Sequence, residues 1–379
     1  MAERVLVTGG AGFIGSHLVD ALCRAGHKVR VLDNLEPQVH APEGGPAAWP
    51  AYANGRAEYR LGDVRDVKAL GSALQDVQVV YHLAARVGVG QSMYEIEKYV
   101  DVNSRGTAVL LDLLANDARL RREVRKLVVA SSMSVYGEGS YCCSEHGEQY
   151  PGLRPPAQLA ERKWEPGCLA CGRSLQPAPT NEDKPLQASS IYAISKRDQE
   201  EMCLAFGRAY SLPVVALRFF NTYGSRQALS NPYTGVAAIF CGRLLNGQPP
   251  VLFEDGRQLR DFVHVSDAVQ ALELVASREE ADFNVYNVGA GRALSVLEVA
   301  ELLIGRLGSA CRPEVVARFR AGDIRHCFAD ISRLGRLGYR PRVAFGDGLG
   351  ELVAWVQAQS AADTFGAAQE ELYQRGLAQ

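Results

Sequence analysis

Short apolar runs and helical apolar patterns alternate along the first part of the chain. The runs that predict buried strands lie at 4–8, 28–32, 77–83, 126–131 and 214–219. Apolar residues recur at helical spacing over 16–25, where Gly26 ends the pattern, and over about 104–116. Because strands that alternate with helices wind parallel sheets, this pattern predicts an α/β fold with a doubly wound parallel sheet.

Two stretches interrupt the pattern. Residues 36–60 carry four of the seventeen prolines and several glycines, which predicts a long loop after the second strand. Residues 138–185 hold seven prolines and four of the nine cysteines, which predicts an insertion with little helix. From about 236 onward short strands and helices mix. We therefore expect a nucleotide-binding domain over 1–235, which includes the insertion, and a smaller mixed α/β lobe over 236–379.

Composition and charge narrow the class of protein. The chain has 41 Lys+Arg and 43 Asp+Glu, a net charge of −2, and its scattered basic residues give no footprint for nucleic acid. No stretch approaches 18 uninterrupted apolar residues, and the first twenty residues do not read as a signal peptide. Nine cysteines are too few for a disulfide scaffold. We therefore expect a cytoplasmic protein with neither nucleic acid nor a membrane as partner.

A glycine-rich turn links the first strand to the first helix. Gly9, Gly12 and Gly15 form a G-x-x-G-x-x-G pattern, in which bare backbone can approach a pyrophosphate at a helix N-terminus. Asp33 ends the next strand, 18 residues after Gly15, where its carboxylate can accept both ribose hydroxyls and would repel a 2′-phosphate. The pattern predicts an NAD site. Asp63 can contact the adenine edge, although a turn aspartate explains its position as well.

Serine, tyrosine and lysine form a second set of candidate residues. Ser132 lies where a strand reaches the carboxyl edge of the sheet, the edge at which open α/β sheets bind ligands. Tyr192 and Lys196 are four residues apart in a helical run, so the phenol and the ammonium share one face. A nearby cation favours the phenolate, so we expect Lys196 to lower the pKa of Tyr192. His82 ends a strand and is expected to be a packing residue rather than a catalyst.

The chain resembles the extended short-chain dehydrogenases/reductases, in particular the nucleotide-sugar epimerase/dehydratase family, from residue 5 to about 339. The matching pieces are 8–15, 82–85, Asn103 within 100–107, 131–137, 192–196, 218–221, 260–265 and 320–323. The resemblance implies a Rossmann-type domain that holds NAD tightly, and a nucleotide-sugar-binding lobe. It also implies a homodimer that forms through the helices at about 104–116 and 190–209.

The resemblance also assigns roles to residues. It makes Tyr192 the catalytic base, Ser132 the partner of the reacting sugar hydroxyl, and Lys196 the residue that positions nicotinamide. The residues it places on the sugar nucleotide are Ser132, Tyr192, Asn221, Arg260, Arg320 and Asp323. Two guanidiniums suit a diphosphate because each can bind phosphate oxygens bidentately. The residues it places on NAD are Gly9, Gly12, Phe13, Ile14, Gly15, Asp33, Asn34, Asp63, Val64, Leu83, Ala84, Ala85, Asn103, Tyr192, Lys196 and Phe219.

Two positions after Ser132 indicate which reaction to expect. Dehydratases of the family carry an Asp-Glu pair there, and decarboxylases usually keep the glutamate, whereas this chain has Met133 and Ser134. Neither side chain can protonate a leaving hydroxyl, so the expected reaction is 4-epimerisation through a transient 4-keto sugar. The alternatives are an NDP-4-keto-sugar reductase and, from another class, a non-catalytic protein that binds NAD or a sugar nucleotide.

The substrate expectation depends on three segments. The loop at 36–60, the insertion and residues 230–235 most resemble family members assigned as dTDP-L-rhamnose 4-epimerases, which implies a dTDP-6-deoxyhexose. UDP-glucuronate 4-epimerases are the second choice. A glucuronate carboxylate needs a cation or several N–H donors, and the sequence does not identify them.

The clustered cysteines predict a metal site inside the insertion. Ser132 and Tyr192 are 60 residues apart, about 35 more than is usual in the family, and the excess contains the cluster. Cys168 and Cys171, followed by glycine, have the spacing of a zinc knuckle, and Cys142, Cys143 and His146 offer further ligands. A structural zinc would take Cys168, Cys171, one of Cys142 and Cys143, and either the other or His146. Reduced loop cysteines or a labile disulfide are the alternatives.

Overall fold

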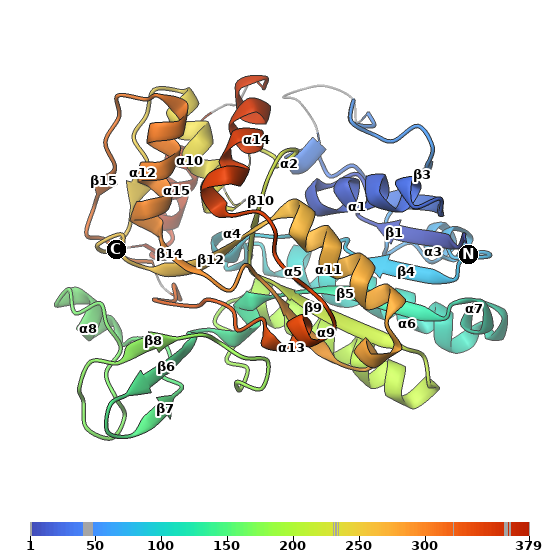
Figure 1. Cartoon of the computed structure of the whole chain (residues 1–379), viewed down its shortest axis with the longest axis horizontal. Helices are drawn as coiled ribbons and strands as arrows, with labels where there is room; N and C mark the ends of the chain where they lie inside the picture. Colours follow the sequence, from blue (N-terminus) through green and yellow to red (C-terminus); the bar gives the residue numbers. More distant parts are fainter. Residues whose placement is uncertain are drawn as a thin grey trace.

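The fold is built on a seven-stranded, all-parallel sheet with helices on both faces (Figure 1). The computed structural model describes residues 2–40, 48–229, 231, 233, 235–320, 322–359, 363 and 365–378. The strands, in spatial order, are β13 (Val285–Val288), β9 (Val214–Phe219), β5 (Lys126–Ser132), β4 (Val79–His82), β1 (Arg4–Thr8), β2 (Lys28–Asp33) and β3 (Glu58–Leu61). The doubly wound α/β fold predicted from the sequence is confirmed.

Alternate residues of each strand enter cores on opposite faces of the sheet. In β1, Val5 and Val7 join one core, and Leu6 joins the other. The helices over the first core are α1 (Phe13–Arg24), α11 (Val265–Ser277) and α13 (Ser332–Arg336). Those over the second are α3 (Val67–Ala73), α6 (Gly106–Asn116), α7 (Ala118–Glu123) and α9 (Ile191–Tyr210). This sandwich fixes the carboxyl ends of β1, β2, β4, β5 and β9 along one edge.

The short connecting elements lie mostly near that edge. They are α2 (Pro37–His40), α4 (Val89–Ser92), α5 (Ile96–Tyr99), the π-helical segment η1 (Val100–Arg105), the 3₁₀ segment η2 (Met133–Tyr136) and the more distant η3 (Glu279–Ala281). Residues 41–47 of the expected long loop, and positions 230, 232 and 234 of the 230–235 segment, fall outside the described residues. None of the helices in the described parts of the chain has an apolar stretch long enough to cross a bilayer.

A smaller lobe packs over the carboxyl edge. Its strands are β10 (Asn221–Tyr223), β12 (Leu259–His264) and β14 (Ala293–Ser295) in one sheet, and β11 (Val251–Leu252) and β15 (Glu314–Val315) in another. Its helices are α10 (Val236–Leu245), α12 (Val296–Leu307), α14 (Phe345–Gln357) and α15 (Phe365–Gln374). Beyond the boundary expected near 235, β13 and α11 return to the large sheet and its first core. The two parts are therefore separate in space, but the boundary near 235 does not divide the sequence cleanly between them.

The insertion forms a small antiparallel sheet of its own, which the sequence pattern did not predict. Its strands, in the order β7-β6-β8, are β7 (Gly147–Gln149), β6 (Ser140–Cys143) and β8 (Gln176–Ala178). A single short helix, α8 (Pro156–Ala160), agrees with the low helix content expected there. The unit projects from one corner of the molecule, beside the smaller lobe (Figure 1).

Candidate active site

A cavity of about 670 Å³ lies between the carboxyl edge of the large sheet and the smaller lobe. It is lined by most of the residues that the sequence predicted for cofactor and substrate. From the cofactor set these are Gly9, Gly12, Phe13, Ile14, Gly15, Asp33, Asn34, Asp63, Val64, Leu83, Ala84, Ala85 and Phe219. The catalytic and substrate sets contribute Ser132, Tyr192, Lys196, Asn221, Arg260, Arg320 and Asp323. One continuous cavity thus joins the two predicted sites.

The glycine turn leaves room for a ligand at the start of α1. Gly9 has φ +71°, and a Cβ there would meet the Ala84 backbone at 2.9 Å. A Cβ on Gly15 would lie 2.2 Å from the Gly9 carbonyl oxygen. No side chain caps α1, whose N-cap is Gly12. The first N–H groups of the helix therefore face the cavity without a side-chain partner, as a pyrophosphate requires.

Asp33 is fixed at the end of β2. Its carboxylate accepts hydrogen bonds from the backbone N–H groups of Ala11 (3.0 Å) and Leu35 (2.9 Å), and it is 7% exposed. His40 lies 3.8 Å from it. A buried carboxylate beside the glycine turn fits the ribose hydroxyls of NAD and disfavours the 2′-phosphate of NADP. The residues present therefore fit NAD.

Asp63 lines the same end of the cavity, but its carboxylate is already engaged. Partial burial opposes ionisation, yet the Arg65 guanidinium at 2.7 Å and the Asn34 amide at 2.9 Å together lower the pKa of Asp63 to about 2. This carboxylate is therefore ionised and oriented at neutral pH. Contact between Asp63 and the adenine edge stays a prediction.

Asn103 differs in its placement from the other residues predicted for the cofactor. It is fully buried and is not among the residues that line the cavity. Its amide accepts from the Arg86 backbone N–H (2.8 Å) and donates to the Arg86 carbonyl (3.0 Å) and the Ser195 hydroxyl (2.9 Å). Those three bonds occupy the amide, so in this structure Asn103 braces the loop after β4 against α9, and its contact with NAD stays a prediction.

The Ser132 and Tyr192 side chains meet at the centre of the cavity wall. Ser132 ends β5, and its Oγ accepts from the Ser134 N–H (3.2 Å). Tyr192 lies in the first turn of α9, which begins after the N-cap Ser190. Burial raises the pKa of Tyr192, and its hydrogen bond with Ser132 opposes that rise. The paired hydroxyls can share a proton with a substrate oxygen placed between them.

Lys196 follows one turn later on α9, and its environment corrects one expectation. Burial lowers the pKa of Lys196 to about 7. Its Nζ donates to the Gln199 amide oxygen (2.7 Å), and Lys196 is not among the groups that shift the pKa of Tyr192. The expectation that Lys196 lowers the tyrosine pKa is therefore wrong for this structure, since Gln199 holds the ammonium.

A buried polar layer supports these residues from behind. Ser131 donates to Glu200 (2.6 Å), which also pairs with Arg218 (2.5 Å). His82 is buried between the hydroxyls of Thr8 (2.9 Å) and Thr107 (3.1 Å). Burial, followed by the charge of Lys196, lowers the pKa of His82 to about 3. His82 is thus a neutral packing residue, as predicted.

The smaller lobe contributes two arginine side chains to the lining of the cavity. Arg320 pairs with Asp323 (2.8 Å) and lies over the Phe253 ring, 4.6 Å from its centroid. Arg260 donates to the carbonyls of Ile324 (2.8 Å) and Arg325 (2.9 Å), so that segment orients its side chain. Both guanidiniums border the cavity, where they can reach a diphosphate.

Sequence reasoning missed several parts of the lining, and two of them are α15 and Arg86. The first is α15, which contributes Phe365, Gln369 and Leu372 although it lies beyond the matching segment. The second is Arg86, which pairs with Glu36 (3.2 Å) and Glu95 (3.1 Å). Arg86 directly follows the 82–85 motif, and this position could have indicated that it lines the cavity. Nothing local in the sequence relates α15 to the cavity.

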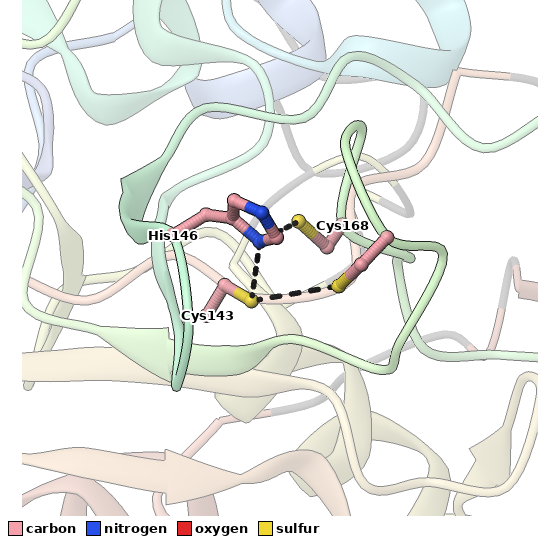
Figure 2. Close-up of side chains that lie close together, drawn as sticks. Cys143, His146 and Cys168 are labelled. Carbon is pink, nitrogen blue, oxygen red and sulfur yellow. Dashed lines mark hydrogen bonds between the residues drawn. The ribbon is translucent and has the colours of Figure 1, made fainter.

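The predicted metal ligands also come together, with one exception. Cys143, His146, Cys168 and Cys171 place their ligand atoms within 4.8 Å of one another, outside the cavity (Figure 2). Cys142 is exposed and outside this group, because successive strand residues point to opposite faces of β6. Of the two alternatives, Cys143 therefore lies in one group with His146, Cys168 and Cys171, and metal binding by this group stays a prediction.

A parallel sheet with a glycine turn and a Ser, Tyr and Lys set at its carboxyl edge defines an extended short-chain dehydrogenase/reductase. The chain belongs to the NAD dependent epimerase/dehydratase family, whose model matches residues 5–158 and 169–289, and it is an enzyme of that family. It is 35% identical over 357 residues to a dTDP-L-rhamnose 4-epimerase of Burkholderia thailandensis, covering 93% of this chain and 95% of that protein.

Solved structures show the same fold. The UDP-glucose 4-epimerase of Thermus thermophilus in complex with NAD is 29% identical, has a TM-score of 0.73, and covers 94% of this chain and 100% of its own. The UDP-glucuronic acid 4-epimerase of Bacillus cereus, in complex with UDP-glucuronic acid and NAD, is 26% identical with a TM-score of 0.75. It covers 93% of this chain and 99% of its own. The family, the α/β fold and an NAD-dependent enzyme are thereby established.

Proposed function

We propose that the protein is an NDP-sugar 4-epimerase with tightly bound NAD, and that its substrate is a dTDP-6-deoxyhexose of the dTDP-L-rhamnose type. The observation that carries the proposal is the hydrogen-bonded Ser132 and Tyr192 pair in a cavity shared with the glycine turn and two arginines. NAD, when bound, supplies reversible hydride acceptance at its nicotinamide ring.

The residues at the strand end provide for proton transfer and binding of the substrate. Acting as the phenolate, Tyr192 removes the proton of the C4 hydroxyl and becomes a phenol as C4 loses its hydride, which leaves a 4-keto sugar. The Ser132 hydroxyl forms a hydrogen bond with the C4 oxygen of the sugar. After the ketone has turned within the cavity, the hydride returns to the opposite face of C4 and Tyr192 returns the proton. Net redox is zero, and the product is the C4 epimer.

The same strand end argues against elimination. Met133 and Ser134 also line the cavity, and neither side chain has an acid that could protonate a leaving hydroxyl. Ser134 donates to the Ser132 hydroxyl at 2.9 Å, so it extends the hydrogen-bonding pair. This arrangement supports epimerisation over 4,6-dehydration and over decarboxylation.

The charges of the lining support a neutral C5 substituent. Among the described lining residues, the basic side chains are His40, Arg86, Lys196, Arg260 and Arg320, and burial lowers the pKa of His40. His40 faces Asp33, Arg86 is paired with two glutamates, and both arginines of the smaller lobe suit the diphosphate. Only Lys196 is then left near the sugar, and it is required for nicotinamide. A methyl group at C5 fits this balance better than the carboxylate of glucuronate.

The decisive experiment incubates purified protein, without added cofactor, separately with dTDP-L-rhamnose and UDP-glucuronate. We expect NMR to detect C4 inversion of dTDP-L-rhamnose, and the Tyr192→Phe variant to lose turnover by roughly 10²- to 10⁴-fold while retaining NAD. Inversion of UDP-glucuronate instead would transfer the substrate assignment to that sugar. Turnover that required NADH or NADPH and a 4-keto sugar would replace the epimerase by a reductase, and unchanged turnover in Tyr192→Phe would reject the mechanism.

We also propose that two copies associate through α6 and α9. Ile194 on α9 is 45% exposed, and Ile96 of α5 and Val100 of η1, two elements packed against α9, are also exposed. Exposed apolar side chains grouped on contacting elements are typical of a protein interface. Light scattering of the purified chain is expected to give the mass of a dimer; a monomer at micromolar concentration would refute this proposal.

A further inference from the structure

The insertion has too little apolar core to hold its shape alone. Its buried apolar cluster consists of Tyr141, Cys143, Cys168 and Leu175, two of which are cysteines. Its strands are three or four residues long. A unit of this size cannot bury enough apolar surface to offset the conformational entropy of ordering a proline-rich loop. Some other crosslink is needed to fix it.

Two loops of the insertion share one design. Residues 143–147 and 168–172 each begin with a cysteine, place a second ligand residue three positions later and end with glycine. Gly147 has φ +65° and Gly172 has φ +71°, a left-handed conformation that lets the chain turn back directly after the second ligand. The glycine after His146 makes the first loop a counterpart of the knuckle predicted at Cys168 and Cys171.

Backbone groups in both loops point at the sulfurs. The N–H groups of Glu145 and His146 donate to Cys143, and the N–H of Arg173 donates to Cys171. Donors arranged around a sulfur stabilise a thiolate, which is the form of cysteine that binds metal.

Three of the six distances within the cluster match the edges of a tetrahedron around a metal, and all six are within 4.8 Å. The His146 Nδ1 atom lies 3.5 Å from Cys143 Sγ and 3.7 Å from Cys168 Sγ (Figure 2). The Cys143 and Cys171 sulfurs are 3.8 Å apart. With Zn–S bonds of about 2.3 Å and Zn–N bonds of about 2.0–2.1 Å, tetrahedral geometry places sulfur and nitrogen about 3.6 Å apart and two sulfurs about 3.8 Å apart. A disulfide would require two sulfurs at about 2.05 Å.

We propose that Cys143, His146, Cys168 and Cys171 bind one structural zinc ion, which holds the insertion against the wall of the nucleotide-sugar cavity. Three thiolates and one imidazole form a closed donor set of the kind that selects zinc and leaves no position for a substrate. The second part of this inference rests on the proposed function, because it takes the cavity as the site of the sugar nucleotide.

The metal site is linked to the cavity wall through Glu165. This residue lies three positions before Cys168. It accepts from the Arg325 guanidinium at 2.6 Å and pairs with His326 Nε2 at 2.9 Å. The side chain of Arg325 is 1% exposed, and Glu165 is one of three carboxylates that balance its charge, with Glu254 at 2.9 Å and Asp255 at 2.6 Å.

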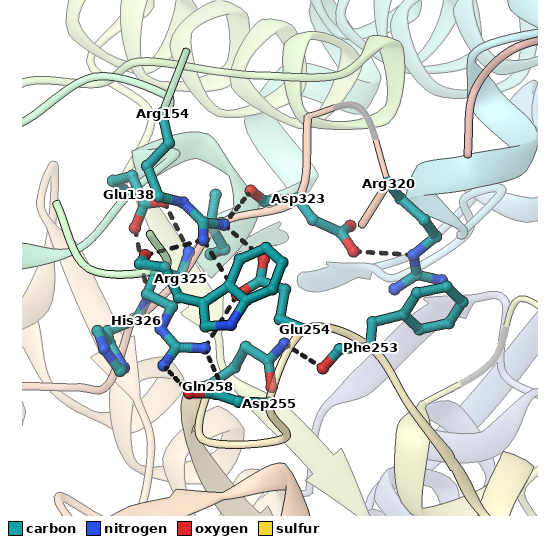
Figure 3. A network of polar contacts seen from close by, with 12 residues as sticks. Glu138, Arg154, Phe253, Glu254, Asp255, Gln258, Arg320, Asp323, Arg325 and His326 are labelled. Carbon is teal, nitrogen blue, oxygen red and sulfur yellow. Dashed lines mark hydrogen bonds and ion pairs between the residues drawn. The ribbon is translucent and has the colours of Figure 1, made fainter. Parts of the chain in front are cut away.

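Arg154 provides a second link from the insertion. Its guanidinium, also 1% exposed, pairs with Glu254 at 2.8 Å and donates to the Asp323 carbonyl at 3.1 Å (Figure 3). Glu138 completes the junction by accepting from the Arg325 backbone N–H at 2.6 Å. Insertion side chains therefore share in holding segment 323–326, together with Asp255 of the smaller lobe, which pairs with Arg325 at 2.6 Å. That segment orients Arg260 and pairs with Arg320, the two candidate diphosphate ligands.

Metal analysis tests the ligand set directly. Protein produced without a histidine tag is expected to contain one zinc per chain by mass spectrometry of the metal, and the Cys142→Ser variant is expected to match it. Cys143→Ser and Cys168→Ser are expected to lose the zinc. Cobalt(II) in its place should give the visible spectrum of a tetrahedral thiolate site. Metal-free wild-type protein that takes up no zinc on reconstitution, or loss of two of the nine thiols to a disulfide, would overturn the site.

Ligand binding tests the link to the cavity. Calorimetry with dTDP and with UDP is expected to show about 2- to 30-fold weaker binding of the preferred nucleotide by Cys168→Ser than by Cys142→Ser, while NAD content stays the same. If a variant does not fold, zinc is removed from wild-type protein with a chelator and binding is measured before and after re-addition. Unchanged affinity after zinc loss would reject the link. Neither readout depends on which sugar is epimerised, so failure here and failure of the proposed function are distinguishable.

Discussion

The region around β5 and α9 and the insertion between them are held in place by different physical means. Tyr192 and Lys196 lie on a 20-residue helix that packs on a parallel sheet with apolar cores on both faces. The insertion has a four-residue cluster, a Cys/His group and buried ion pairs of Arg154. Burial of apolar surface is diffuse and tolerates single changes, whereas polar and metal crosslinks depend on each member. In the first region many apolar contacts share the stabilisation, whereas in the second a few crosslinking residues supply most of it.

The largest effect is expected where the sheet region holds a charge that opposes folding. Burial lowers the pKa of Lys196 from 10.5 to about 7, so the native state binds fewer protons there than the unfolded chain between these pH values. This group's contribution to stability therefore rises with pH across that window, and below pH 7 its cost is complete. Lys196→Met should lower turnover by roughly 10²- to 10⁴-fold and raise the stability of NAD-free protein at pH 7 by about 1 to 4 kcal/mol.

Denaturant unfolding of NAD-free Lys196→Met and wild type at pH 7 and pH 9.5 measures the stability that the buried lysine costs. The difference between the two proteins should shrink at the higher pH, because the wild-type lysine is then less disfavoured. Lys98→Met is a matched control, since the Lys98 side chain is 57% exposed and should show neither effect. A difference that grew with pH would contradict the assigned direction of the shift.

A matched pair of leucines, one in each region, sharpens the comparison through stability alone, without an effect on the catalytic residues. Leu6 in β1 and Leu175 in the insertion are both at most 1% exposed. Leu6→Ala should cost about 2 to 5 kcal/mol of global unfolding free energy, because densely packed neighbours on the sheet cannot close the void. Leu175→Ala should leave the main transition in place and instead speed proteolytic cleavage within 138–185. Equal loss of global stability in both variants would show that the insertion unfolds together with the sheet.

The features that were predictable from the sequence are those set by residues close together along the chain. The strand ranges, the glycine turn and the spacing of Tyr192 and Lys196 follow from local patterns, and the structure agrees with them. Contacts between distant residues were not predictable in this way. The Glu138 side chain binds the Arg325 backbone 187 positions away, and α15 reaches the cavity from the far end of the chain.

Two predicted residues are placed in a way that the sequence could not show. Asn103 belongs to a matching motif, but Arg86 and Ser195 occupy its amide. Cys142 has a suitable side chain on the wrong face of its strand, and the choice became visible only once the β6 and β7 pairing placed Cys143 opposite Gly147. Residue type and spacing identify candidates, whereas the hydrogen bonds of the folded chain decide which of them remain free to bind a ligand.

The smallest effect is expected from an exposed ion pair that joins the two ligand-bearing loops. Arg173 pairs with Glu145 across the insertion, and the two side chains are 62% and 48% exposed. Solvent screens such a pair, so Glu145→Gln should change stability by less than about 1 kcal/mol and leave zinc content at the wild-type value. If the variant lost its metal, or if its insertion became as sensitive to protease as that of Leu175→Ala, charge pairing rather than metal ligation would be the main crosslink. The backbone N–H of Glu145 bonds to Cys143 and is retained in the variant, so the measurement separates side-chain charge from the loop geometry that serves the metal.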